Sequence, residues 1–269
     1  MNDTSLFSLR AHLKKAHLEF LPLFHNLPFT FKEKANSHDR DPDDLFGYSS
    51  DISGDYLIVG AIAEDLDENG NNFIIQSGAA YIFERDGLGN WNFAQKLVPS
   101  HRGIGYDFGI SVAIDGDRAI VGAYDDPLDE NGANQLSGAG AAYIFERNGS
   151  GVWVETAKLV ASDRNGGELL GGAVDISGDY AIVGAYRDGE DANGLNPLTF
   201  AGSAYLYERN GAGVWSQVQK VTANQRTAID FFGWTVAIDG DYAVVGCHLD
   251  EEDVNELNPL NNAGAAYIY

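Results

Sequence analysis

Residues 108–123 read FGISVAIDGDRAIVGA. The stretch opens with a Phe-Gly pair, closes with Val-Gly-Ala, and places Asp115-Gly116 between two runs rich in apolar and β-branched residues. Two-residue turns of this composition favour a type I′ hairpin, because both residues tolerate positive φ. The stretch therefore predicts two antiparallel strands, at residues 110–114 and 118–123.

The same pattern occurs four times, each copy 62 residues after the one before it and without an insertion. The other copies are residues 46–61, FGYSSDISGDYLIVGA, residues 170–185, LGGAVDISGDYAIVGA, and residues 232–247, FGWTVAIDGDYAVVGC. A tyrosine further along each repeat keeps the same spacing, at Tyr81, Tyr143, Tyr205 and Tyr267. A fixed period of this kind predicts an array of similar structural units.

Each repeat contains four predicted strands. In the second repeat, two further strand signals follow at Ala141–Arg147 and Val152–Val160, and a Gly-rich turn at residues 148–151 joins them. The central strands show little polar alternation, so both faces of each sheet must be covered. We predict an all-β fold, a β-propeller of four four-stranded blades whose repeats start near residues 44, 106, 168 and 230. An open solenoid of the same blades is the alternative.

The two ends of the chain predict how the ring closes. The fourth repeat stops at Tyr269, after its third strand. Counting back by 62 from the outer strands, which start near Trp91, Trp153 and Trp215, reaches Phe29, and the lysines of those strands map onto Lys34. We therefore predict that residues 29–34 add the missing strand to the last blade and close the ring, which removes two exposed sheet edges. A closed ring of this kind predicts a monomer.

Residues 1–28 lie outside the repeat and form a predicted tail, either helical or disordered, so the propeller domain spans residues 29–269. Apolar residues such as Leu6, Leu9 and Leu13 would share one side of a helix. The charges at Asp3 and Lys14 do not fit a secretory signal, and none is visible in this chain. No run of about eighteen apolar residues occurs, so we expect no membrane insertion.

Charge limits the classes of partner. Seventeen basic and 40 acidic residues give a formal net charge of −23, which disfavours nucleic acid and anionic lipid. Cations or basic partners fit this charge, and so does acidity that only keeps the protein soluble. Cys247 is the chain's one cysteine, so no internal disulfide can form.

The paired motifs resemble the FG-GAP repeat, found in the N-terminal propeller of integrin α subunits and in many bacterial surface and secreted proteins. They are Phe46-Gly47 with Val59-Gly60-Ala61, Phe108-Gly109 with Val121-Gly122-Ala123, Leu170-Gly171 with Val183-Gly184-Ala185, and Phe232-Gly233 with Val245-Gly246-Cys247. The resemblance covers residues 29–269. It implies a β-propeller binding module, a role in recognition or cell adhesion, and an extracellular or cell-surface location.

One feature of integrin-type repeats is missing. Those repeats carry an Asp-rich calcium loop between the Phe-Gly and Gly-Ala elements, where this chain has only short turns such as residues 114–117. A turn of two residues cannot supply the roughly six to eight oxygens that calcium needs. The chain therefore resembles the short, bacterial form of the repeat.

The long loops between the second and third strands hold a different candidate metal site. They carry 16 of the 40 acidic residues and share an Asp-x-Asn pattern, whose alternating oxygens suit calcium. The candidate ligands are Asp67, Asn69, Asp129, Asn131, Asp191, Asn193, Asp253 and Asn255. No glutamate completes a calcium loop, and Asx turns explain the same pattern without metal. Both interpretations stay open.

Arginines in the loops between blades form the candidate ligand-binding set. They repeat every 62 residues, at Arg40, Arg102, Arg164 and Arg226. A ring of guanidinium groups could hold an anionic ligand, or each arginine could pair with an acidic loop and pin a blade junction. On the innermost strands, Asp51 and Asp175 could bind a cation at the axis or line a solvated channel.

No catalytic arrangement is visible. His38, His101 and His248 occupy non-equivalent repeat positions, and Cys247 stands where other repeats have alanine, as a small packed residue would. The sequence predicts a non-enzymatic module that binds protein or glycan through its long-loop face, with calcium as the candidate cofactor. A structural part of a larger surface or secreted protein is the alternative, and a hydrolase or lyase a further one.

Overall fold

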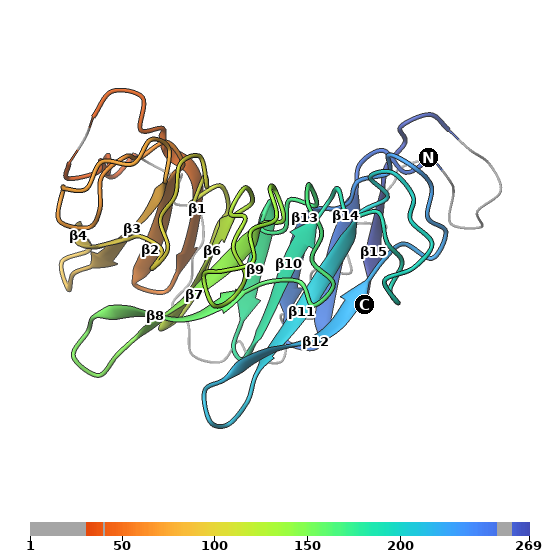
Figure 1. The fold of residues 1–269 in the computed structure, drawn as a ribbon. Coiled ribbons are helices and arrows are strands. Elements are labelled where there is room, and N and C mark those ends of the chain that lie inside the picture. The colour runs from red at the N-terminus through yellow and green to blue at the C-terminus, as the bar shows by residue number, and fades with distance from the viewer. Residues whose placement is uncertain (1–30, 40, 252–259) are drawn as a thin grey trace, which may run out of the picture. The chain divides into compact units, whose positions relative to one another are not determined.

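A computed structural model describes residues 31–39, 41–251 and 260–269. Within these residues every regular element is a β-strand, and the strands form four antiparallel sheets (Figure 1). The predicted four-bladed β-propeller is confirmed. Among the same residues, no helix has the length and apolar character needed to cross a membrane.

Each blade is a meander in which the strands pair in chain order. Blade 1 contains β1 (Phe46–Ser53), β2 (Tyr56–Ala61), β3 (Ala79–Arg85) and β4 (Trp91–Leu97). Blade 2 contains β5 (Val112–Asp115), β6 (Arg118–Ala123), β7 (Ala141–Arg147) and β8 (Trp153–Leu159). Blade 3 contains β9 (Ala173–Ser177), β10 (Tyr180–Ala185), β11 (Ser203–Arg209) and β12 (Trp215–Val221). Blade 4 contains β13 (Phe232–Asp239), β14 (Tyr242–Cys247) and β15 (Ala265–Ile268).

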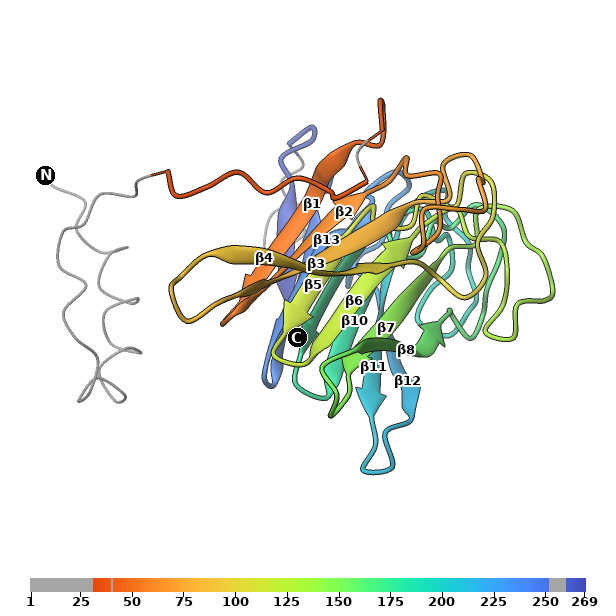
Figure 2. The same ribbon diagram turned by 90° about the vertical axis from the view of Figure 1, so that its left-hand side faces the viewer.

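The loops of the meander separate by length. The long loops after β2, β6 and β10 gather on one side of the blades, and the tight hairpin turns lie on the other (Figures 1 and 2). The predicted long-loop face is therefore present.

The predicted hairpin turn is one residue out of place. Asp115 pairs with Arg118, so the two loop residues are Gly116 and Asp117. Gly116 has φ +55°, whereas Asp117 does not adopt positive φ, so the predicted type I′ turn is wrong. Positive φ at the first central residue only is the pattern of a type II′ turn, which glycine favours at that position.

Three apolar junctions join successive blades. At the first junction, Ile58 and Ile82 of blade 1 pack in one buried cluster with Ile114 of blade 2. Equivalent clusters join blades 2 and 3 and blades 3 and 4. The Val-Gly-Ala glycine is needed because the next blade is so close: a Cβ at Gly60 would lie 2.1 Å from the carbonyl oxygen of Gly109.

The strand predicted to close the ring is not present in the described residues. Residues 31–34 belong to no strand, residues 29 and 30 lie outside the described residues, and the described sheet of blade 4 has three strands. Closure by residues 29–34 thus stays a prediction, as does the tail at residues 1–28, which also lies outside the described residues. Residues 35–269 form one compact unit.

Candidate functional site

A small pocket lies where residues of all four blades meet. The residues that follow the Phe-Gly position of each repeat are Tyr48, Ile110, Gly172 and Trp234. Together with two tyrosines that follow Val-Gly-Ala, Tyr124 and Tyr186, they line a pocket of about 280 Å³. We call this the axial pocket. Because β1, β5, β9 and β13 are the first strands of their blades, the repeat itself brings these side chains together.

Aromatic rings continue from the axial pocket over blade 4. The centroid of the Trp234 ring lies 4.7 Å from that of Tyr186, edge to face, and 4.6 Å from that of His248. Phe231 stacks on His248 at 5.7 Å. Trp234 and Tyr48 are both more than a third exposed. The pocket therefore offers aromatic surface that a ligand can reach.

Carboxyl groups flank this aromatic wall. Burial raises the pKa of Asp107 to about 6, although a hydrogen bond with the Tyr124 hydroxyl favours its charged form. Burial also raises the pKa of Asp125, against the opposing effect of the Arg187 guanidinium. The edge of the pocket thus combines hydroxyl and carboxyl groups that can exchange hydrogen bonds with a polar ligand.

A buried lysine ties the loops of blade 1 to its sheet. Lys96 Nζ lies 2.6 Å from Asp39 Oδ2 and 3.1 Å from Glu64 Oε1. The Tyr81 hydroxyl donates to Glu64 Oε2 at 2.7 Å. The lysine side chain is almost fully buried, so these two carboxylates take the place of water as partners of its ammonium group.

Blade 3 repeats this arrangement. Lys220 Nζ lies 2.7 Å from both Asp163 Oδ2 and Asp188 Oδ2, and the Tyr205 hydroxyl donates to Asp188. Burial disfavours the charged lysine, but the bonds to the two carboxylates outweigh it and raise the pKa of Lys220.

Blade 2 has lost one of the two carboxylates. His101 stands at the repeat position of Asp39 and Asp163, and its Nδ1 lies 3.1 Å from Ser100 Oγ. Among the described residues, Lys158 Nζ forms an ion pair with Asp126 Oδ2 alone, at 2.8 Å, and has no well-aligned hydrogen bond. Burial consequently lowers the pKa of Lys158.

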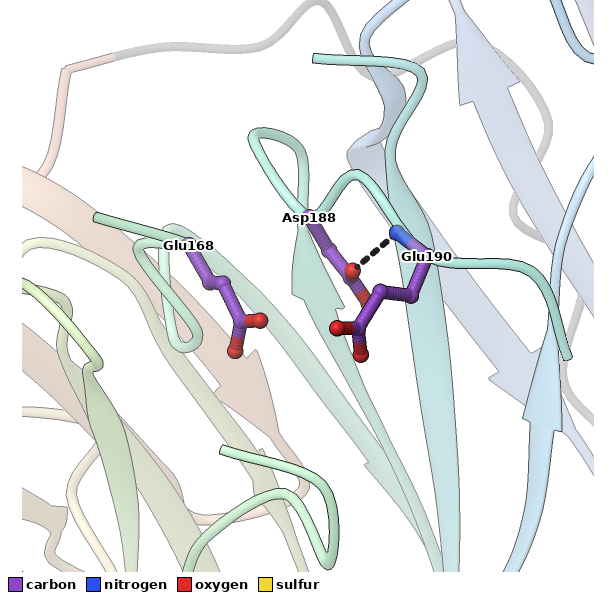
Figure 3. Close-up of side chains that lie close together, drawn as sticks. All are labelled: Glu168, Asp188 and Glu190. Carbon is purple, nitrogen blue, oxygen red and sulfur yellow. Dashed lines mark hydrogen bonds between the residues drawn. The ribbon is translucent and has the colours of Figure 1, made fainter. Parts of the chain in front are cut away.

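A group of acidic side chains converges in blade 3 (Figure 3). Oxygens of Glu168, Asp188 and Glu190 lie within 4.8 Å of one another. Two of these carboxylates already have hydrogen-bond donors: Asp188 pairs with Lys220, and Glu168 Oε2 accepts the backbone N–H of Asn165 at 2.9 Å. Burial, assisted by the Asp188 charge, raises the pKa of Glu168 to about 7. The equivalent Asp44 in blade 1 has its pKa raised to about 6, again mainly by burial.

These raised values predict how stability depends on pH. A carboxyl whose pKa is higher in the folded state stabilises the fold when protonated, and that contribution is lost as pH rises through the folded pKa. We therefore expect the melting temperature to fall as pH rises from about 4 to about 7, between the ordinary pKa values of Glu168 and Asp44 and their raised values. Glu168→Gln should remove the share of this fall that Glu168 contributes, on the order of 2 kcal/mol at pH 8, and leave the share of Asp44 in place. Thermal melts across this range test it, with the exposed Glu130→Gln as control. Parallel pH profiles for the wild type and Glu168→Gln would contradict the assignment.

The candidate metal ligands in the long loops bind their own backbone. Asp67 Oδ1 accepts the N–H groups of Asn69 and Asn71, both at 2.9 Å. Asp129 accepts those of Asn131 and Ala133, and Asp191 those of Asn193 and Leu195. These bonds lower the pKa of Asp67 and Asp129, and the pKa of Asp191 is lowered first by the Asn196 side-chain amide and then by its backbone bonds. Asp253 and Asn255 lie outside the described residues. The geometry is that of Asx turns.

A single substitution separates the turn from a calcium site. If the turn bonds explain Asp129, Asp129→Asn should lower the melting temperature equally in calcium and in a chelator, because the lost bonds are internal. A calcium site predicts instead a saturable stabilisation of the wild type that the variant lacks. Thermal melts of both proteins at matched ionic strength are the measurement. We expect the equal change, and a calcium-specific difference would overturn the turn interpretation.

The candidate arginines reach from one blade to the loop of the preceding blade. Arg102 donates to the carbonyl oxygens of Asn72 and Asp65, both at 2.8 Å. Arg164 donates to Pro127 and Asn134, and Arg226 to Gly189 and Asn196. Arg40 lies outside the described residues. The described arginines therefore support the interpretation that each one pins a blade junction. Their partners are backbone carbonyl groups, whereas the sequence suggested acidic side chains.

The two inner-strand aspartates also bind across a junction. Asp51 accepts the N–H of Ile114 at 2.8 Å, and Asp175 accepts that of Ile238 at 2.6 Å, each from the next blade. The structure brings both carboxylates to the inner strands as predicted, but backbone donors already engage them.

Sequence reasoning missed the axial pocket. The signal was the position after each Phe-Gly pair, where four equivalent residues are Tyr, Ile, Gly and Trp although their neighbours repeat closely. A ligand site that evolved on a repeated scaffold would show this pattern, in which one position varies between repeats while its neighbours stay the same.

Comparison with known protein families identifies the repeat. A family model described as FG-GAP repeat matches residues 29–83, 91–145, 153–207 and 215–269. The last three matches each begin at or near the start of an outer strand, and all four end in or just after the third strand of a blade. A comparison with curated proteins finds no match.

Proposed function

This chain belongs to the FG-GAP repeat family, and from that premise we propose that it is a non-enzymatic binding module that recognises neutral glycans at the axial pocket. FG-GAP propellers typically serve as binding or structural modules, which fits a site without a catalytic arrangement. An extracellular or cell-surface location belongs to the same proposal and is supported by the family.

The observation that carries the proposal is aromatic surface beside hydrogen-bonding groups in a small concavity. Sugar rings present apolar C–H faces, which pack on aromatic rings, and hydroxyls, which bond to groups such as the Tyr124 hydroxyl and Asp107. A pocket of about 280 Å³ lies at the lower end of the roughly 300–1,000 Å³ that ligand pockets span, which suits a small ligand such as one sugar residue. Trp234 and Tyr186 would form the stacking corner.

Charge supports neutral glycans over acidic ones. The chain has a net charge of −23, and Asp107 and Asp125 lie beside the pocket tyrosines. A carboxylate or sulfate on the ligand would be repelled by this field. Calcium assistance at the long loops stays a prediction, and the Asp129→Asn comparison decides it.

A glycan array tests the proposal. We expect the wild type to bind a set of neutral glycans, and Trp234→Ala to lose at least about tenfold in affinity, because the stacking surface is removed. Phe73→Ala is the matched control, since Phe73 is an exposed aromatic residue that does not line the axial pocket. Binding of acidic glycans only, or equal binding by Trp234→Ala and the wild type, would contradict it.

A further inference from the structure

A second cavity lies in blade 2, between the loop that precedes β5 and the long loop after β6. Its volume is about 560 Å³, which is larger than that of the axial pocket. We call it the blade 2 cavity. The polar side chains that line it are those of Tyr106, Asp125, Gln135 and Ser137. No hydrogen bond joins the side chain of Tyr106, Gln135 or Ser137 to another described residue, so all three are available to a ligand.

The tyrosine of this cavity replaces a residue that serves the fold in the other blades. The equivalents of Tyr106 are the carboxylates Asp44, Glu168 and Asp230. Each of them accepts a backbone N–H from three residues earlier in its own loop, at 2.7, 2.9 and 2.7 Å. Tyr106 makes no such bond and lines the cavity instead. Blade 2 has therefore exchanged an internal loop contact for a phenol that a ligand can reach.

The long loop after β6 differs from its equivalents in the same way. Gln135 and Ser137 stand at the repeat positions of Phe73 and Ile75 in blade 1, which are apolar. Both polar side chains are exposed. Together with Tyr106 and Asp125 they supply an amide, two hydroxyls and a carboxyl, which can donate hydrogen bonds to sugar hydroxyls and accept hydrogen bonds from them.

The blade 2 cavity adjoins the axial pocket. Tyr124 lines the axial pocket, and the next residue, Asp125, lines the cavity. Tyr106 lines the cavity, and the next residue, Asp107, forms a hydrogen bond with the Tyr124 hydroxyl. The same two short segments thus border both concavities, so a ligand that fills the axial pocket can continue into the cavity.

The aromatic wall over blade 4 offers less to a longer ligand. Phe231 stacks on Phe200 at 5.9 Å with 17° between the ring planes, and on His248 at 5.7 Å with 13°. These rings therefore cover one another's faces, and a sugar needs a free face for stacking. The blade 2 cavity, in contrast, presents polar groups that have no partner among the described residues.

We propose that the ligand is a neutral oligosaccharide of more than one sugar residue, which runs from the axial pocket into the blade 2 cavity. One sugar residue packs on Trp234 in the axial pocket, and the following part of the chain bonds through its hydroxyls to Tyr106, Gln135 and Ser137. This inference rests on the proposed function and adds the length of the ligand and its direction across the long-loop face.

Calorimetric titration of the full chain tests this inference. The probes are the monosaccharide, disaccharide and trisaccharide of the neutral sugar that the glycan array selects. We expect the wild type to bind the trisaccharide at least about tenfold more tightly than the monosaccharide. Tyr106→Phe, Gln135→Ala and Ser137→Ala should each weaken trisaccharide binding by about fivefold, the worth of one hydrogen bond, and leave monosaccharide binding unchanged. Leu136→Ala is the matched control, because Leu136 is 38% exposed in the same loop and does not line the cavity.

The titrations separate this inference from the proposed function. Trp234→Ala should weaken the binding of all three probes, because it removes the stacking surface that each of them uses. A wild type that binds the monosaccharide as tightly as the trisaccharide overturns the inference and leaves the proposed function standing. So do cavity variants that keep the wild-type affinity for the trisaccharide, or that lose no more than Leu136→Ala. A wild type that binds no neutral sugar of any length overturns both.

Discussion

Asp126→Asn is expected to lower the free energy of unfolding by about 3–5 kcal/mol, because it leaves the buried Lys158 ammonium without a carboxylate. Asp126 is fully buried, pairs with Lys158 at 2.8 Å and also accepts the Tyr143 hydroxyl. The equivalent lysines of blades 1 and 3 each have a second carboxylate, which blade 2 lacks because residue 101 is histidine.

Blade 3 supplies the matched control. Asp163→Asn leaves Lys220 paired with Asp188 at 2.7 Å, so the loss should be only about 1 kcal/mol. His101→Asp should restore the missing carboxylate and recover part of the stability lost in Asp126→Asn. Urea unfolding of the four proteins is the measurement. Equal losses for Asp126→Asn and Asp163→Asn would show that the second carboxylate does not matter.

Gly184→Ala is expected to destabilise the propeller by about 3 kcal/mol, at the upper end for overpacking, because the added methyl group meets backbone that cannot rotate away. Its Cβ would lie 2.1 Å from the carbonyl oxygen of Gly233 in the next blade. Either the blades move apart or the junction loses its packing.

Gly246→Ala is the control at the same repeat position. In the described residues the three atoms nearest to a Cβ there all belong to Thr235 of the same blade, and the side-chain oxygen of Thr235 would have to turn aside. We expect a loss below about 1 kcal/mol. Unfolding curves that show the same loss for both glycines would mean that local strain, and not the blade junction, fixes this residue.

The fold could be predicted because it is repeated. Four copies in register showed which residues are equivalent, and the bounds of β6 and β7 agree with the predicted strands. The predicted turn type was wrong because residue composition does not determine which two residues lie between the paired strands. Asp115 pairs with Arg118, so the turn residues are Gly116 and Asp117. The closing strand at residues 29–34 followed from the register, which by itself does not determine what that segment packs against.

The site was harder to predict, for a physical reason. The repeat register shows which residues are equivalent but not what they contact, so it left open whether Asp67 and Arg102 bind a ligand or the protein itself. In the structure both bind loop backbone. Lys158 is important because residue 101 is histidine, so the second carboxylate of the equivalent lysines is missing. The sequence does not show this, because it does not show that the lysine is buried beside residue 101. The axial pocket forms from residues about 62 apart, whose convergence needs the curvature of the whole array.

The four tryptophans allow the most direct test of the central claim, that ligand binds at the axial pocket. Trp91, Trp153 and Trp215 begin equivalent outer strands, whereas Trp234 lines the pocket. Their indole N–H groups give separate NMR signals, which Trp→Phe variants assign. Titration with the tightest neutral glycan of the array should move the Trp234 signal in a saturable manner and leave the other three in place. A shift at Trp153 or Trp215 with Trp234 unmoved would contradict the account.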